Sequence, residues 1–133
     1  MELQQKTKIH TNGLIPPYGG ELKNLIIKDK NLKIDLISKA TYEFECSERN
    51  ACDVELLMVG AFSPLEGFMD ENNYKSVIKT NRDKSGLLFG LPIVFDSNNE
   101  KVKAGETILL TYKNQKIAIL EVSSKWELSL IHI

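Results

Sequence analysis

Ten residues in the middle of the chain, residues 60–69, constrain its fold more than any other stretch. Two glycines and a proline fix the backbone there, so the stretch is a shaped loop and not the interior of a helix or strand. Four of its ten side chains are large and apolar, namely Phe62, Leu65, Phe68 and Met69. Exposed loops seldom carry so much apolar surface, so we expect the loop to fold back onto the core, with Phe62 and Phe68 as anchors.

Helical patterns flank this loop on both sides. Before it, apolar residues recur at the i, i+3, i+4 and i+7 spacing of one helix face, namely Val54, Leu57, Met58 and Ala61. Ser47 is placed to cap the start of this helix, and Gly60 stands where a helix end favours positive φ. Asp70 can cap a second, short helix after the loop. The unit is therefore predicted to be a helix, a loop packed on the core, and a second helix.

Strand patterns dominate the second half of the chain. Residues 41–46 are β-prone, and residues 91–95 form a short apolar run typical of a strand that is buried on both faces. Residues 107–112 and 116–123 are two β-rich runs, and the polar residues 113–115 between them indicate a hairpin. Because the last run has apolar residues on both faces, it favours a strand in a closed barrel.

Several segments form a collinear set that has a counterpart in a known family. They are Pro17-Tyr18-Gly19-Gly20-Glu21-Leu22, Asp53-Val54-Glu55-Leu56-Leu57, residues 60–69, Tyr74, Ser76-Val77, Gly90-Leu91-Pro92-Ile93-Val94-Phe95-Asp96 and Lys125-Trp126-Glu127. This set resembles the N-terminal domain of the sulfate adenylyltransferases (ATP sulfurylases) and covers about residues 14–127. Tyr18 replaces the usual His of the family's Pro-His-Gly-Gly segment, and the Trp of its Trp-Pro-Ile-Pro-Ile strand is lost.

The resemblance implies an α+β, mainly β fold, a PUA-like β-barrel with short helices, over residues 14–127. Residues 30–40 fit a strand or a helix by pattern alone, and the resemblance implies the helix. Residues 1–13 are expected to form a flexible N-terminal arm. Residues 128–133 read Leu-Ser-Leu-Ile-His-Ile, which is the translation of a transposon adapter used in sequencing libraries. We therefore expect these six residues to be a non-native read-through tail and the chain to be an enzyme fragment.

The resemblance also implies the activity of the intact enzyme. Family members attack the α-phosphorus of ATP with sulfate and form adenosine 5′-phosphosulfate and pyrophosphate, using MgATP. The family's Gln-x-Arg-Asn, His-x-x-His and Gly-Arg-Asp segments, which form a cationic cage for phosphate charge, do not occur in this sequence. We therefore expect an inactive fragment with no catalytic, cofactor-binding or metal-binding residue. Its expected partner is the missing catalytic domain, and the intact enzyme is expected to form a homo-oligomer.

The loop has a structural or interdomain role in this interpretation. Its motif residues are Gly60, Phe62, Ser63, Pro64, Gly67, Phe68 and Met69. Ser63 has no neighbouring base that would make it a nucleophile, so we expect it to form a turn. Glu55 is expected on the solvent-exposed face of its helix, and Glu66 is expected at the tip of a turn. If the loop meets a catalytic domain, its apolar side chains Phe62, Phe68 and Met69 would be a partly exposed patch here.

Composition narrows the remaining function classes. Seventeen basic and eighteen acidic residues give a net charge of −1, which argues against nucleic acid or an anionic membrane as partner. No apolar run approaches the ~20 residues of a membrane helix, and no secretory signal is evident, so a cytoplasmic protein is expected. Cys46 and Cys52 are expected to be free, buried thiols without zinc. A stand-alone PUA-like RNA-binding or protein-interaction module is the alternative function.

Overall fold

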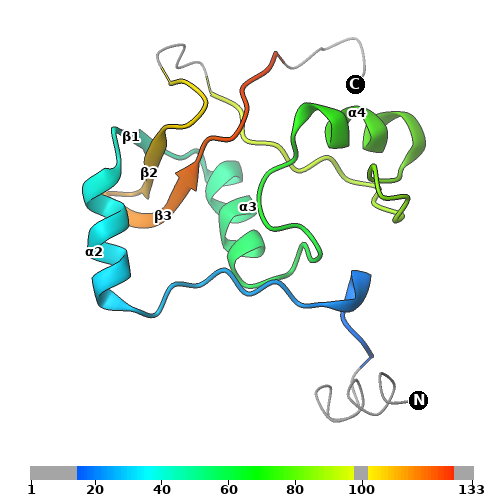
Figure 1. Ribbon diagram of the computed structural model, residues 1–133, viewed down its shortest axis with the longest axis horizontal. Helices are drawn as coiled ribbons and strands as arrows, with labels where there is room; N and C mark the ends of the chain where they lie inside the picture. Colours follow the sequence, from blue (N-terminus) through cyan, green and yellow to red (C-terminus); the bar gives the residue numbers. More distant parts are fainter. Residues whose placement is uncertain (1–14, 98–101, 128–133) are drawn as a thin grey trace.

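Residues 15–97 and 102–127 are described by the structure, a computed structural model (Figure 1). In chain order its elements are η1 (Tyr18–Gly20), α2 (Lys30–Lys39), β1 (Tyr42–Glu45), α3 (Glu48–Met58), α4 (Glu71–Thr80), β2 (Thr107–Tyr112) and β3 (Gln115–Glu121). From left to right, Figure 1 shows α2, the sheet, α3 and α4. The expectations for residues 1–13 and 128–133 lie outside the described residues.

Each α-helix begins at a polar cap. Ser47 accepts a hydrogen bond from the backbone N–H three residues on at 3.2 Å, and Asp70 does the same for α4 at 2.8 Å. Asp29 accepts two such bonds at the start of α2. Gly60 follows α3 with φ +84°, the left-handed conformation that glycine adopts without a steric penalty. The predicted roles of Ser47, Gly60 and Asp70 at the helix ends are therefore confirmed.

The three strands form an open, mixed sheet in the order β1-β2-β3. β1 pairs in parallel with β2, with Tyr42 opposite Ile108, and β2 pairs antiparallel with β3. Lys113 and Asn114 join β2 to β3 with φ values of +49° and +64°, as in a two-residue hairpin turn. The hairpin is confirmed, and its turn is one residue shorter than expected.

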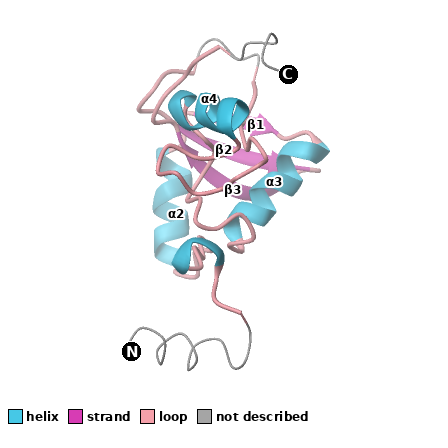
Figure 2. Ribbon diagram, turned by 90° about the vertical axis from the view of Figure 1, so that its right-hand side faces the viewer, coloured by secondary structure: helices cyan, strands magenta, loops and turns pink. Residues whose placement is uncertain are grey.

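The core lies between α3 and the sheet, which are neighbours in both views (Figures 1 and 2). Ala51 and Val54 on one face of α3 pack in one cluster with Ile108 and Leu110 of β2. All four are nearly excluded from solvent, and Leu110 is only 1% exposed. Burial of such aliphatic side chains is the main term that holds α3 on the sheet, at about 1.5–3 kcal/mol for each large side chain.

The expectation of a mainly β fold is wrong for the described residues. Helices of 10, 11 and 10 residues outweigh strands of 4, 6 and 7 residues. The described residues form a small α+β domain whose sheet is open, so the closed barrel is not seen in them.

The buried strand expected at residues 91–95 is absent from the structure. This segment has no assigned strand, and Leu91 is 54% exposed. Pro92 has no N–H to donate to a strand ladder. The carbonyl of Ile93 instead accepts a hydrogen bond from the N–H of Met69, at 2.7 Å. The segment therefore supports the loop and does not extend the sheet.

Three smaller expectations have mixed outcomes. Lys30–Lys39 form the helix that the resemblance implied for residues 30–40, although α2 buries none of its side chains. Both cysteines are free, but only Cys46 is buried, whereas Cys52 is exposed on α3. β3 ends at Glu121, earlier than expected.

In the part of the chain that the structure describes, no helix is long and apolar enough to cross a membrane.

Candidate functional site

The central loop, residues 60–69, connects α3 to α4 through a tight turn that is tied down at both ends. At its start the N–H of Ser63 donates to the carbonyl of Gly60 at 3.1 Å. At its end the N–H of Met69 donates to the carbonyl of Ile93 at 2.7 Å. The loop is therefore a fixed part of the domain, although none of its residues belongs to a helix or a strand.

Ser63 makes turn bonds. Its hydroxyl donates to the carbonyl of Gly60 at 2.6 Å and accepts from the N–H of Lys23 at 2.9 Å. The side chain is only 7% exposed, and both hydrogen-bonding capacities are used by backbone groups. A hydroxyl held in this way closes a turn and binds a second segment, and it has no general base beside it to make it a nucleophile.

The loop's last apolar residues point into the domain. The ring of Phe68 meets Phe95 edge-on at a centroid distance of 5.3 Å, and Phe95 meets Phe44 of β1 at 5.2 Å. Met69 is 5% exposed, while Phe62 and Phe68 are half-buried. The apolar patch expected from Phe62, Phe68 and Met69 is therefore wrong for Met69, because the loop turns this side chain inward.

A second segment, which the sequence analysis did not connect with the loop, lies against it. This segment, residues 17–25, is named the strap; it runs below α3 in Figure 1. A Cβ added to Gly19 of the strap would lie 2.8 Å from Pro64 of the loop. A Cβ added to Gly60 would lie 2.8 Å from the side chain of Leu22 and 3.0 Å from a strap carbonyl. The two segments therefore approach each other where only glycine leaves room.

Polar contacts fix the strap in place. Lys23 contacts Glu66 of the loop at 3.0 Å and Glu21 of the strap at 3.2 Å. Hydrogen bonds to Glu66 and then to Glu21 raise the pKa of Lys23, so this ammonium stays charged. The N–H of Leu25 donates to the carbonyl of Met58 at 2.9 Å and so satisfies one of the free carbonyls at the end of α3.

The signal that could have linked strap and loop was the pair of glycine-containing motifs. Gly19 of the strap is closely approached by the loop, and Gly60 of the loop is closely approached by the strap. Tyr18 adds a further contact, because its hydroxyl donates to the carbonyl of Leu88. No pattern in the sequence indicated a partner for this tyrosine.

Among residues 15–97 and 102–127 no group of three His, Cys, Asp or Glu side chains could hold a metal ion.

Two shallow hollows, of about 200 and 240 Å³, lie at the starts of α4 and α3. The first is lined by Asp70, Glu71, Asn72, Ser124, Lys125 and Trp126, so that one cation faces two carboxylates. Arg82 lies elsewhere and donates to the carbonyl of Gly86 at 2.9 Å. Neither hollow is a cationic cage for a polyphosphate.

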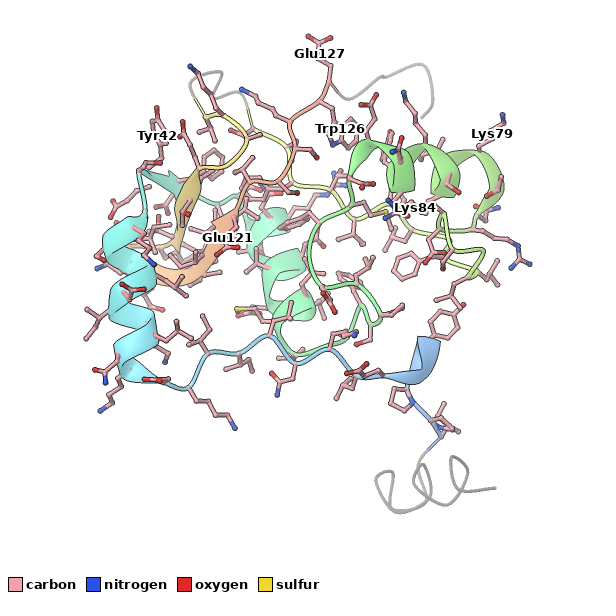
Figure 3. The ribbon with its side chains drawn as sticks, viewed as in Figure 1. Tyr42, Lys79, Lys84, Glu121, Trp126 and Glu127 are labelled. Atoms are coloured by element: carbon pink, nitrogen blue, oxygen red, sulfur yellow. The ribbon has the colours of Figure 1, made fainter. Side chains whose placement is uncertain are left out.

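Trp126 lies beyond β3 and packs on α4. Its ring centre is 5.0 Å from that of Tyr74, which is buried on α4, and Figure 3 shows Trp126 beside this helix. Lys125-Trp126-Glu127, which the resemblance includes, has no assigned helix or strand. The segment instead holds the end of the described chain against α4.

The strap, the loop and the sheet all lie within the part of the chain that matches a known domain family. The sequence profile of the PUA-like domain matches residues 15–132, which is most of the chain. The chain belongs to the PUA-like domain family.

Relatives of this PUA-like domain include sulfate adenylyltransferases. The enzyme of Neurospora crassa is 40% identical over 121 residues, which are 84% of this chain and 21% of the relative. The enzyme of Vesicomyosocius okutanii is 35% identical over 123 residues, which are 90% of this chain and 31% of the relative. The resemblance seen in the sequence is thus confirmed, and the chain spans about a fifth to a third of the length of these relatives.

A solved structure shares the fold of this PUA-like domain. It is described as a hexameric APS kinase from Thiobacillus denitrificans, with a TM-score of 0.75 and 32% sequence identity. The match covers 86% of this chain and 24% of that chain.

Proposed function

We propose that this PUA-like domain is a non-catalytic part of a sulfate adenylyltransferase, an enzyme that activates inorganic sulfate. The observation that carries the proposal is the 40% identity over 121 residues to the Neurospora crassa enzyme. The structural relative is described as an APS kinase, and APS is adenosine 5′-phosphosulfate, the product of that activation, so this likeness agrees with the proposal.

In this proposal the chemistry takes place outside these 133 residues. Attack of sulfate on the α-phosphorus of ATP creates phosphate charge that needs several fixed cations or N–H donors. Of the two hollows described above, one is lined by a single cation and the other by none, and Lys23 beside the loop is already paired with two carboxylates. MgATP and sulfate would therefore bind to the longer enzyme, and this domain would supply a rigid surface to it. A cytoplasmic location and a homo-oligomeric intact enzyme are part of the proposal.

The test is a domain exchange. The 123 matched residues of the Vesicomyosocius okutanii enzyme are replaced by the corresponding residues of this chain, and sulfate-dependent release of pyrophosphate from ATP is measured. We expect activity within about tenfold of the parent enzyme and none from the 133-residue chain alone. Turnover by the chain alone, or a folded but inactive chimera, would contradict the proposal.

The alternative is a stand-alone RNA-binding or protein-interaction module, and its RNA-binding form can be tested on the same protein. A gel shift with structured RNA at two salt concentrations is expected to show no complex, because the chain has a net charge of −1. A salt-dependent complex would favour the RNA-binding module over the enzyme domain.

A further inference from the structure

Four aliphatic side chains lie together on the surface where the strap crosses the end of α3. They are Leu22, Leu25, Leu56 and Val59, which are 56%, 36%, 39% and 52% exposed. We call this set the strap patch. The loop residues suspected from sequence contribute less, because Met69 is buried.

Backbone contacts place the members of the strap patch side by side. The N–H of Leu25 bonds to the residue before Val59, and the side chain of Leu22 lies over the residue after it, Gly60. Leu56 and Val59 are three residues apart at the end of α3, so they share one face of the helix. The two segments that carry the patch therefore lie against each other, although they are more than thirty residues apart in sequence.

The patch has a charged edge. Glu55 is exposed next to Leu56, and its carboxylate has no partner among the described residues. On the strap side Glu21, Lys23 and Glu66 already neutralise one another in part. A surface that fits this face would be apolar at its centre and would carry a lysine or arginine opposite Glu55.

We propose that the strap patch is the surface by which this domain docks on the remainder of a longer sulfate-activating enzyme. The length of the relatives indicates what covers the strap patch. The part that matches this chain is 21% to 31% of their polypeptide, so most of the enzyme lies outside it and is the expected partner. The four exposed side chains are all aliphatic, and exposed apolar side chains gathered in this way are typical of a contact with protein. This inference rests on the proposed function.

The test uses the chimera with the Vesicomyosocius okutanii enzyme. Leu56→Asp and, separately, Val59→Lys place an unpaired charge in the centre of the contact, and Glu55→Lys reverses its edge. The matched control is Ile34→Asp on α2, where an aliphatic side chain is 67% exposed but lies outside the strap patch. Because Leu56 and Ile34 are both exposed, the 133-residue chain should unfold at nearly the same temperature with either substitution.

In the chimera we expect Leu56→Asp and Val59→Lys to lower pyrophosphate release at least about tenfold and to split thermal unfolding into two transitions. Glu55→Lys should have a smaller effect in the same direction, and Ile34→Asp should change neither reading. An active chimera that tolerates Leu56→Asp as well as Ile34→Asp would overturn the docking surface and leave the proposed function intact.

Two other outcomes would also overturn the proposal. A folded but inactive unsubstituted chimera would contradict the proposed function and the docking surface with it. A concentration-dependent dimer of the 133-residue chain that Leu56→Asp dissociates, seen by light scattering, would assign the strap patch to a second copy of this chain.

Discussion

Replacing Gly60 by alanine is expected to destabilise the domain by about 2–4 kcal/mol, for two separable reasons. Gly60 has φ +84°, where an L side chain adds about 1–2 kcal/mol of strain. The new methyl group would also lie 2.8 Å from the side chain of Leu22 and 3.0 Å from the backbone carbonyl of Lys23. The leucine can rotate away, but the carbonyl belongs to the hydrogen-bonded strap, so only part of the overlap remains and adds about 1–2 kcal/mol.

Two other glycines separate these contributions. Gly67 has no positive φ and nothing within 4 Å of an added Cβ, so Gly67→Ala should change the free energy of unfolding by less than about 0.5 kcal/mol. Gly20 has φ +95° but open space around it, so Gly20→Ala should lose only the strain of about 1–2 kcal/mol. The substitution at Gly67 therefore adds neither effect, the one at Gly20 adds backbone strain alone, and the one at Gly60 adds both strain and steric overlap.

The assay is urea unfolding of the three variants, followed by fluorescence of the chain's one tryptophan, Trp126, and by circular dichroism. A melting temperature about 10 °C lower for Gly60→Ala should accompany the loss, given the size of the domain. The double variant Leu22→Ala with Gly60→Ala should be less destabilised than the sum of the two single variants. Equal stability of Gly60→Ala and Gly20→Ala would refute the reasoning, because it would mean that the strap does not lie on the loop.

Three further predictions use the same protein. Ser63→Ala should destabilise it by about 1–3 kcal/mol in urea unfolding, because the buried hydroxyl holds both Gly60 and Lys23, whereas the exposed Ser85→Ala should change far less; equal effects would argue against this tie. The hydrogen bond from the backbone of Asn73, and then the contact with Lys84, hold the pKa of Asp70 below its ordinary value. This contribution to stability is therefore present above the ordinary pKa of an aspartate and is lost as pH falls through the lowered value. Asp70→Asn should flatten the acid side of the plot of unfolding free energy against pH. An unchanged plot would contradict the role of the Asp70 carboxylate. Cys52 is exposed and Cys46 is buried, where burial raises the pKa of its thiol, so a thiol reagent at neutral pH should modify one cysteine quickly and the second only on unfolding; two fast modifications would contradict the placement of Cys46.

Local patterns predicted the helical part of the fold well. Ser47, Gly60 and Asp70 act within a few residues of their own position, so capping and positive φ could be inferred from the sequence. The hairpin after Tyr112 was predicted for the same reason, since its turn and both strands are adjacent in the chain. The extra expected turn residue, Gln115, belongs to β3 and pairs with Tyr112.

Contacts between distant segments account for the errors. The apolar run at residues 91–95 fits a strand by composition, but the pairing of Ile93 with Met69 depends on where the loop lies. The strap was not placed because its partners, Gly60 and Glu66, are about forty residues away, and the two glycine-containing motifs do not by themselves say which segments meet. The structural or interdomain role of the loop stays a prediction, but Met69 turns inward, and exposed aliphatic residues near the loop belong partly to the strap.

The parallel pairing of β1 with β2 sets an order of events during synthesis. Glu45 and Thr111, which meet at the end of this pairing, are 66 positions apart, so β1 has no strand partner until β2 leaves the ribosome. At 5–20 residues per second this interval is roughly 3–13 s, and closing a loop of that length costs about 4 kcal/mol of chain entropy. During that time α3 can be helical, but Ala51 and Val54 have no sheet to cover them. The nascent chain is therefore most prone to aggregate, and most dependent on chaperones, in the interval between α3 and β2.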